Sequence, residues 1–437
     1  MKALTPEQII TFRKTFEEDR AARTAEAAMA RTEMADLAYI PANAAKLQGD
    51  FEIELKTRGI TAQQKSGRCW LFAALNILRE VAAEKCGLKE FELSQNYLSF
   101  YDKLEKANNF LEMVIANADK PLDDPMMVYL MSTGIDDGGY WVMAADLVRK
   151  YGAVPKTAMP ETYQSEHTAT FMKYLNQLLR RDAAELREKT AAGGDPEPLR
   201  EQMMAEIYRA ECIAFGEPVQ TFEFSYRDAD NVYHVDRNLT PKTFYDKYIG
   251  LDLEEYVAVT NMPSRKSNER YAFHFTGSMA ESRVVDLNLS MDEVQELVLA
   301  QLRGGEPVWF GCDAGAFGAR KEGVWDPDSF DYQGLLGGAD FTMDKKNRLA
   351  YRGSCATHAM LLVGVSFDEN GQPSRWKIEN SWGKENGKDG YFVCSQKYFR
   401  EYVYEAIIGK KYMTDAQKAL LSREPVEVAP WNADYAL

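Results

Sequence analysis

The stretch Thr61-Ala62-Gln63-Gln64-Lys65-Ser66-Gly67-Arg68-Cys69-Trp70-Leu71-Phe72-Ala73-Ala74 joins polar loop residues directly to an apolar helical pattern, with Cys69 at the junction. A helix N-terminus presents unpaired N–H groups and partial positive charge, which favour a thiolate over a thiol. Because the thiolate is the nucleophile, this position suits a reactive cysteine. Gln63 precedes Cys69 by six residues, and its side-chain amide is a candidate donor to an oxyanion formed beside the sulfur. Taken alone, Cys69 also fits a small, buried, unreactive side chain.

The composition limits the classes of protein to consider. The chain has 437 residues, 45% of them hydrophobic, which predicts two or three structural units. No run of about 18 apolar residues occurs, so we expect no membrane span. The start lacks the apolar core of a signal peptide, and none of the six cysteines forms Cys-x-x-Cys, which together predict a reduced, cytoplasmic protein. The four histidines lack ligand spacing, so we predict neither a metal nor a cofactor. A net charge of −15 disfavours nucleic acid as a partner.

Helical patterns dominate the first half of the chain and strand patterns the second, which predicts an α+β protein. We expect helices at 70–86, 94–106, 140–151 and 291–303. The strand-like runs, separated by turn residues as in an antiparallel sheet, are 219–226, 283–287, 307–311, 357–367, 374–380 and 390–394. The predicted units are an N-terminal helical arm (1–45), a helical domain with Cys69 (46–165), an inserted helical hairpin (166–215), a strand-rich domain (216–411) and a C-terminal arm (412–437).

A cysteine nucleophile needs a base and a group that orients the base. His358 begins one predicted strand and Asn380 ends the next one, so neighbouring strands would place them side by side. An Asn carbonyl that accepts from the ring N–H would fix the tautomer and leave the other nitrogen for the sulfur. Separately, His358 fits a polar cap and Asn380 a turn, but Gln63, Cys69, His358 and Asn380 in this order favour acyl transfer.

These residues carry a resemblance to the papain-like cysteine peptidases. Gln-x5-Cys-Trp, His-Ala-x-x-x-x-Gly and Asn-Ser-Trp-Gly are similar to that family's signature. Gly67-Arg68-Cys69-Trp70 resembles the form of the bleomycin hydrolase and aminopeptidase C branch, which has Arg where papain has Ser or Ala. Further segments resemble the same branch over nearly the whole chain, among them Asp137-Gly138-Gly139, 150–156, 307–313 and 399–405.

The resemblance implies a papain-like two-domain fold and a role for each matched residue. Cys69 would be the nucleophile, His358 the general base, and Asn380 the residue that orients His358. Gln63 and the backbone N–H of Cys69 would form the oxyanion hole. Paired glycines before a helix fit a plain turn, and the resemblance implies instead that Gly138 and Gly139 border the substrate.

Relatives of this kind thread the C-terminal arm into their own cleft, where the terminal carboxylate pairs with the free amine of the substrate. Here that carboxylate belongs to Leu437, and Asp434 is a further candidate for amine binding. The last residues, Asn432-Ala433-Asp434-Tyr435-Ala436-Leu437, differ from the branch's more usual Trp-Asp-Pro-Met ending. Members of the branch are commonly homohexamers whose active sites face an inner chamber.

The function expected from these features is that of a cysteine aminopeptidase, which releases N-terminal residues from peptides through a thioester acyl-enzyme. One alternative is a papain-like endopeptidase whose arm stays outside the cleft. A second is a nucleic-acid-binding hexamer that gathers scattered Lys and Arg into a channel, and a third is a scaffold with vestigial chemistry. The intact four-residue set favours the aminopeptidase.

Overall fold

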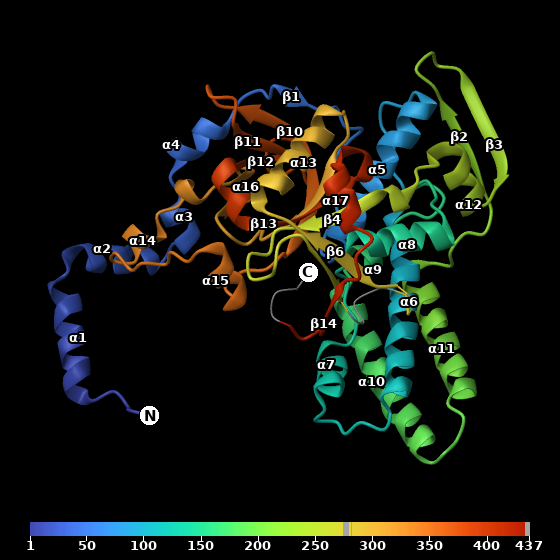
Figure 1. Cartoon of the computed structure of the whole chain (residues 1–437), viewed down its shortest axis with the longest axis horizontal. Coiled ribbons are helices and arrows are strands. Elements are labelled where there is room, and N and C mark those ends of the chain that lie inside the picture. Colours follow the sequence, from blue (N-terminus) through green and yellow to red (C-terminus); the bar gives the residue numbers. More distant parts are fainter. Residues whose placement is uncertain (274–278, 281, 433–437) are drawn as a thin grey trace.

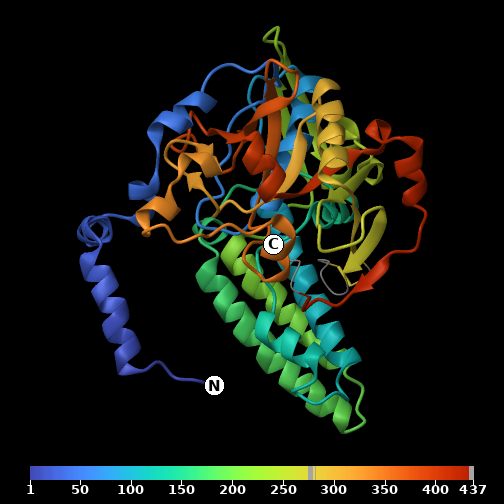
Figure 2. The ribbon, with the colours of Figure 1, turned by 60° about the vertical axis from the view of Figure 1, so that its left-hand side comes forward.

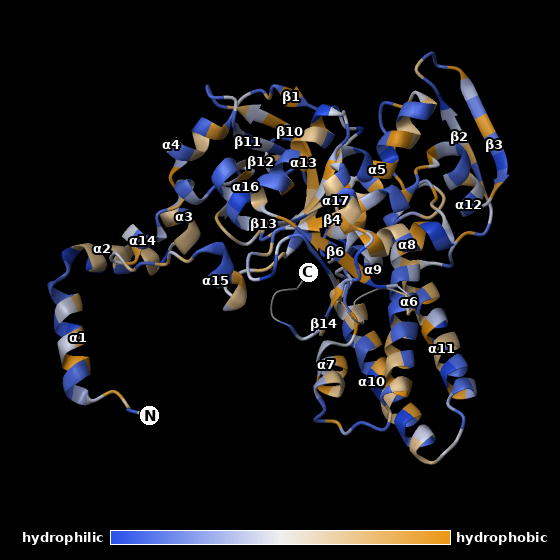
Figure 3. Cartoon of the chain, viewed as in Figure 1, coloured by the Kyte–Doolittle hydropathy of each residue, from blue (hydrophilic) through white to orange (hydrophobic). Residues whose placement is uncertain are grey.

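A computed structural model describes residues 1–273, 279–280 and 282–432. Its centre is a large β-sheet, with a helix-rich part on one side and further helices on the other (Figure 1). Coloured by hydropathy, the central strands are mainly apolar, whereas the peripheral helices alternate polar and apolar residues (Figure 3). This mixture of helices and a central sheet confirms the predicted α+β fold class.

The described residues form a twelve-stranded sheet with the order β14-β5-β6-β4-β13-β7-β10-β11-β12-β9-β8, and β1 pairs with the second half of β10. The strands are β1 (Ile53–Glu54), β4 (Tyr256–Thr260), β5 (Glu269–Phe273), β6 (Val284–Asn288), β7 (Val308–Cys312), β8 (Gly318–Ala319), β9 (Val324–Trp325), β10 (His358–Phe367), β11 (Pro373–Glu379), β12 (Tyr391–Ser395), β13 (Val403–Gly409) and β14 (Val426–Val428). A separate hairpin joins β2 (Phe222–Arg227) and β3 (Tyr233–Leu239).

The prediction of a purely antiparallel sheet is wrong at three pairs. β4 lies parallel to β6, β12 to β9, and β14 to β5. β4 and β6 can run parallel because β5, which separates them along the chain, pairs on the outer side of β6. The strands β3, β4, β5 and β13 were not among the predicted runs.

The helix-rich part contains the helix that carries Cys69. α5 (Cys69–Cys86) is buried along most of its length and ends at Gly87, whose φ of 65° is the left-handed conformation typical of a helix C-cap. Beside it lie α6 (Gln95–Ala116), α7 (Pro125–Thr133), α8 (Trp141–Tyr151), α9 (Tyr163–Glu166), and, beyond the β2–β3 hairpin, α12 (Pro241–Phe244) and the single turns η2 (Tyr245–Ile249) and η3 (Leu253–Glu255). The buried apolar side chains of α5 and α8 form one core with those of β10.

The predicted hairpin is present as α10 (Ala169–Ala191) and α11 (Glu197–Phe215), which flank the turn at 192–196. Together with α6 and α7 they form a bundle that projects from the body (Figures 1 and 2). α6 runs ten residues past the predicted helix end at 106, because its later residues Phe110, Leu111 and Val114 are buried in the core of this bundle.

The remaining helices lie outside the helix-rich part. On the sheet side are η4 (Pro327–Ser329), α13 (Met291–Arg303), α14 (Tyr332–Leu335), α15 (Lys345–Ala350), α16 (Gln396–Tyr402), η5 (Lys410–Tyr412) and α17 (Asp415–Leu420). The N-terminal segment contains α1 (Pro6–Glu18), α2 (Arg20–Met29), α3 (Met34–Ala38), α4 (Pro41–Ala44) and η1 (Ala45–Leu47). α1 has no buried residue and stands away from the body (Figure 2).

Candidate active site

Cys69 is the first residue of α5, where the polar loop enters the helix, as predicted. The side chain is buried, with 8% of its surface exposed. Backbone N–H groups of Ala359, Trp70 and Cys69 act to lower the pKa of the thiol. Ala359 directly follows His358 on β10, so the thiol lies near the end of the strand that carries the predicted base.

The N–H groups at the start of α5 favour the thiolate, as expected, but burial has the larger effect on the pKa of Cys69. Burial raises the pKa of the thiol, and the nearby carboxylate of Asp137 raises it further. The three N–H groups act in the opposite direction, but they do not outweigh the loss of water around the charged form.

His358 and Asn380 lie together, as the strand positions predicted. His358 Nε2 lies 2.8 Å from Asn380 Oδ1, so the ring donates from Nε2 to the amide carbonyl. This tautomer leaves Nδ1 without a proton and able to accept one. Burial lowers the pKa of His358 to about 4, with a smaller contribution from the positive charge of Arg320. The imidazole is therefore neutral near pH 7.

The ring of His358 is stacked on Trp382, with ring centroids 4.7 Å apart. The guanidinium of Arg320 lies over the same indole, 4.4 Å from its centroid. Trp382 thus restrains the imidazole plane while Asn380 fixes its rotation.

Four hydrogen bonds hold Gln63, two through its backbone and two through its side-chain amide. Its N–H donates to the carbonyl of Ser381 at 2.8 Å, and its Oε1 accepts from Ser381 Oγ at 2.7 Å. Its Nε2 donates to the carbonyl of Ser66 at 2.6 Å, and Ser66 Oγ donates back to the Gln63 carbonyl at 2.7 Å. An amide nitrogen carries two hydrogens, so one N–H of Gln63 remains for an oxyanion.

Ser381 connects the two halves of this arrangement. Its backbone N–H donates to Asn380 Oδ1 at 2.8 Å, while its hydroxyl donates to Gln63 Oε1. The residue that orients His358 and the candidate oxyanion donor therefore share one neighbour, which fixes their relative positions across the interface between the helix-rich part and the sheet.

The loop before Cys69 is anchored by a buried ion pair. Arg68 Nη1 lies 3.0 Å from Glu161 Oε2, and Arg68 Nε donates to Ser66 Oγ at 2.9 Å. Ser165, in α9, also donates to Glu161, so the start of the helical insertion is joined to this loop. Glu161 gave no recognisable signal in the sequence, because an acidic residue 93 positions from Arg68 has no local pattern.

The structure places the two candidate substrate glycines beside the start of α5. Gly139 is buried against Trp70, and a Cβ at this position would lie 2.6 Å from the indole ring. Its observed role is close packing, whereas the carbonyl of Gly138 accepts from Lys106 Nζ at 2.6 Å. A contact with substrate stays a prediction for both residues.

Asp137, next to these glycines, was given no role in the sequence and holds the loop in place. Its carboxylate lies 2.7 Å from Lys103 Nζ and accepts from the Gly67 N–H, while its carbonyl accepts from Trp70 Nε1 at 2.7 Å. The buried Lys103 ammonium is the main reason that the pKa of Asp137 is well below its usual range. In the sequence, the adjacent Gly138-Gly139 pair was the feature that could have drawn attention to Asp137.

The candidate residues at the C-terminus, Asp434 and Leu437, lie outside the described residues. The last described part of the arm, β14, runs parallel to β5 at the edge of the sheet, with Val426 opposite Tyr271 and Val428 opposite Phe273. The prolines predict an extended arm at Glu424-Pro425 and Pro430-Trp431. The arm is extended up to and through β14, but the second prediction is wrong: residues 430 and 431 form a turn in which the Asn432 N–H donates to the Ala429 carbonyl at 3.0 Å.

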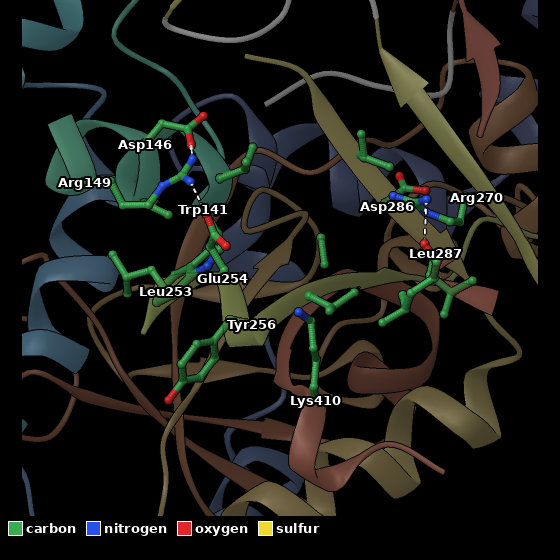
Figure 4. A pocket seen from close by; sticks show the side chains of 16 residues that line it. Trp141, Asp146, Arg149, Leu253, Glu254, Tyr256, Arg270, Asp286, Leu287 and Lys410 are labelled. Atoms are coloured by element: carbon green, nitrogen blue, oxygen red, sulfur yellow. Dashed lines mark hydrogen bonds and ion pairs between the residues drawn. The ribbon is translucent and has the colours of Figure 1, made fainter. Parts of the chain in front are cut away.

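Among the described residues, no group of three or more His, Cys, Asp or Glu is arranged to hold a metal ion. The same part of the chain contains no helix of the length and apolarity that a bilayer crossing requires. A cavity of about 340 Å³ lies between α8, β4 and β6 (Figure 4). Several of its charged groups have partners: Arg149 pairs with Asp146 and Glu254, Lys410 pairs with Glu255, and Arg270 donates to the Leu421 carbonyl. None of the predicted site residues lines it.

Comparison with known proteins agrees with this architecture. The profile of the peptidase C1-like family matches residues 3–434, so the chain belongs to this family. Aminopeptidase G of Lactobacillus delbrueckii subsp. lactis is 42% identical over 434 residues, which cover 98% of this chain and 99% of that protein. Aminopeptidase C of Listeria monocytogenes is 38% identical and covers 98% of both chains. These relatives confirm the resemblance to the bleomycin hydrolase and aminopeptidase C branch.

A solved structure shows the same fold. PepW from Lactobacillus rhamnosis HN001 superposes with a TM-score of 0.96 at 38% sequence identity, covering 99% of this chain and 98% of that one. The match extends over the sheet, the helix-rich part and the projecting bundle, so the predicted papain-like fold with a helical insertion is confirmed.

Proposed function

We propose that this chain is a cysteine aminopeptidase of the bleomycin hydrolase type, with Cys69 as nucleophile, His358 as general base and Asn380 as the residue that orients the base. The observation that carries the proposal is the hydrogen bond of 2.8 Å between His358 and Asn380, at a strand whose next residue, Ala359, helps to lower the pKa of the Cys69 thiol. The aminopeptidases C and G at 38–42% identity support the direction of cleavage.

The reaction follows from the resting protonation states. Because the pKa of the Cys69 thiol is raised and that of His358 is lowered, the pair begins as a neutral thiol and a neutral imidazole. His358 Nδ1 takes the thiol proton as the sulfur attacks the carbonyl carbon. The oxyanion accepts hydrogen bonds from the free side-chain N–H of Gln63 and from the backbone N–H of Cys69.

Collapse of this intermediate breaks the peptide bond. The imidazolium returns its proton to the leaving amine, which departs and leaves the acyl group on Cys69 as a thioester. A water molecule then gives its proton to His358 and attacks the thioester, and the acid product and the thiol are restored. Asn380 accepts from Nε2 throughout, so the ring keeps its orientation as its charge changes.

The aminopeptidase selectivity is assigned to the C-terminal arm. A terminal carboxylate at Leu437 would pair with the free amine of the substrate and occupy the subsites beyond it, so that chains without a free N-terminus are excluded. The extended course of the arm through β14 supports this part of the proposal.

The direct test compares an aminoacyl fluorogenic substrate with the same substrate N-acetylated. We expect hydrolysis of the free-amine form and at least about 100-fold slower hydrolysis of the blocked form, since the blocked form loses a charge-assisted pairing and meets the arm. Equal turnover of both would exclude an aminopeptidase and favour the endopeptidase. Cys69→Ser removes the nucleophile, and Cys212→Ser on α11 is the matched control that keeps full activity.

The proposal also includes assembly of the chain into a homohexamer and a cytoplasmic location. α1 exposes Ile9, Ile10, Phe12 and Phe16 at 42–67% of their surfaces, more apolar area than an isolated exposed helix normally presents to water. We expect these side chains to contact another copy in a homohexamer that acts on peptides in the cytoplasm. The net charge of −15 disfavours nucleic acid as a partner.

A further inference from the structure

Glu405 is a buried carboxyl group that the mechanism above does not use. It lies on β13 with 3% of its surface exposed. Within the described part of the chain, no hydrogen bond or ion pair of its side chain is found, and the effects that act on its pKa are burial and the charge of Asp286. A buried carboxyl group without a partner is costly, so this position suits a ligand that pairs with it.

The sheet register places Glu405 on the same face as the nucleophile. Ala359 on β10 lies opposite Gly311 on β7, and Gly311 lies opposite Glu405 on β13. Directly opposed residues in a sheet project to the same face. Ala359 is the residue whose N–H helps to lower the pKa of the Cys69 thiol, so Glu405 faces the same side two strands away, at roughly 10 Å between the strands.

Gly311 contributes no side chain between these strands. A Cβ at Gly311 would have its nearest neighbours at 3.7–3.8 Å, among them Glu405 Oε2. The carboxyl group of Glu405 therefore lies beside the bare backbone of Gly311, the residue that stands between Glu405 and Ala359 in the sheet.

The other groups of the site lie on the opposite side of the sulfur. Asn380 follows β11, the neighbour of β10 on the side away from β7, and Gln63 is bonded to Ser381 next to it. The imidazole protonates the leaving amine, so the leaving group lies toward β11. The part of the substrate N-terminal to the broken bond then lies toward β7 and β13.

We propose that Glu405, above Gly311, binds the α-ammonium group of the first residue of the substrate. The α-nitrogen of an acyl group on Cys69 is separated from the sulfur by only two carbon atoms, so its position is the same for every side chain. A carboxylate beside the neighbouring strand suits this α-ammonium group better than it suits the cation of a basic substrate side chain, because that cation extends farther from the sulfur. The inference rests on the proposed function. It means that the substrate amine is bound by two carboxylates, that of Glu405 in the sheet and that of the C-terminal arm.

The electrostatic surroundings agree with an ammonium ligand. Burial raises the pKa of Glu405 to about 8, and the charge of Asp286 on β6 contributes. Arg265 lies 3.8 Å from that aspartate. An incoming ammonium favours the charged carboxylate, so binding releases the proton of Glu405 to the solvent. A neutral N-acetyl group offers no such compensation.

The test uses two substrates that differ only in the amine: leucyl-aminomethylcoumarin and 4-methylpentanoyl-aminomethylcoumarin. In the full-length wild type we expect kcat/KM to be far higher for the free-amine substrate. Glu405→Gln should reduce the ratio of the two values by about 10- to 100-fold, the loss expected for a charge-assisted hydrogen bond, mainly through KM of the leucyl substrate. Glu211→Gln is the matched control, since Glu211 on α11 is also a buried carboxyl without a hydrogen bond, but lies in the bundle.

The outcomes separate the inference from the proposed function. A ratio near one in the wild type contradicts the aminopeptidase itself. A large ratio that Glu405→Gln leaves unchanged overturns the role of Glu405. If the Gln variant does not fold, Glu405→Asp decides, because it keeps the charge but withdraws it by one methylene: an intermediate ratio supports the subsite and a wild-type ratio overturns it.

Discussion

Two opposing effects act on the thiol of Cys69, and the structure shows which one dominates. The start of α5 supplies N–H groups that stabilise a thiolate, while the surrounding core removes the water that a thiolate needs. Burial is the larger effect, so in the proposed mechanism deprotonation depends on transfer to His358 at the moment of attack. The neutral, oriented imidazole is the form that would accept this proton.

At this scale, Gln63→Ala tests the oxyanion hole. We expect kcat to fall by about 10²–10³-fold with little change in KM, since the amide donates to charge that develops only in the transition state. Steady-state kinetics on an aminoacyl substrate measure both constants. Gln64→Ala, on the adjacent exposed residue, is the control and should behave as wild type. A Gln63 variant with normal kcat would remove this residue from the site.

The buried His358 also predicts a dependence of stability on pH. Its folded pKa of about 4 lies below the ordinary value of 6.5, so between these values the unfolded chain binds more protons than the folded one. The free energy of unfolding should therefore rise with pH across this window, and be lost as pH falls, by at most about 3 kcal/mol from this group.

Urea unfolding of the wild type and of His358→Gln between pH 4 and 7 measures this contribution as the difference between the two slopes. The Gln variant keeps the shape of the side chain without a titrating ring. Parallel curves for the two proteins would show that the histidine is not held neutral by the fold.

At the scale of elements, the start of α5 is held by the segment that leads into the helical insertion. Arg68 pairs with Glu161, which Ser165 of α9 also contacts, and Arg68 contacts Ser66 in the loop that carries Gln63. The segment at 161–165 thus connects the Gln63 loop to the start of the insertion.

Glu161→Gln should leave the Arg68 charge buried and uncompensated. We expect a loss of about 3 kcal/mol in the free energy of unfolding and, because the Gln63 loop loosens, a fall in kcat of about tenfold. Chemical denaturation and kinetics check the two parts. The double variant Arg68→Met/Glu161→Leu removes both charges and should recover much of the stability but not the rate. If the double variant is as unstable as the single one, the buried charge is not the cause.

At the scale of the whole molecule, the proposed function assigns selectivity to the C-terminal arm. A variant that stops at Asn432 lacks the predicted terminal carboxylate at Leu437. We expect it to hydrolyse N-acetylated substrates at least about tenfold faster than the full-length enzyme, because the blocking anion is gone. Leu437→Ala is the control: it changes the side chain, keeps the carboxylate and should remain selective. Truncation without any gain on blocked substrates would place the arm outside the cleft.

The exposed α1 makes the state of assembly testable. Removal of residues 1–18 takes away the apolar side chains that no other described residue covers, so we expect the assembly to dissociate into smaller species. Sedimentation velocity gives the masses of the full-length and shortened proteins. Glu17→Gln and Glu18→Gln, on the same helix, change charge but not apolar surface and should leave the mass unchanged. A full-length monomer would contradict the proposed hexamer.

The sequence by itself determined the elements with strong local patterns and the order of the chemistry. The helix after Cys69, the inserted hairpin, and the strands with His358 and before Asn380 were all predictable, because hydrophobic period and capping are local properties. The helix at 291–303 was located to the residue. The motif around Cys69, His358 and Asn380 indicated the family before any coordinates.

Only the tertiary structure decided what depends on contacts between distant residues. The parallel pairing of β4 with β6, the Arg68–Glu161 pair and the position of Glu405 over Gly311 join segments with no common local pattern. The raised pKa of Cys69 has the same origin: the helix N-terminus can be recognised from sequence, but the burial that outweighs it is created by the packing of α5 against the sheet.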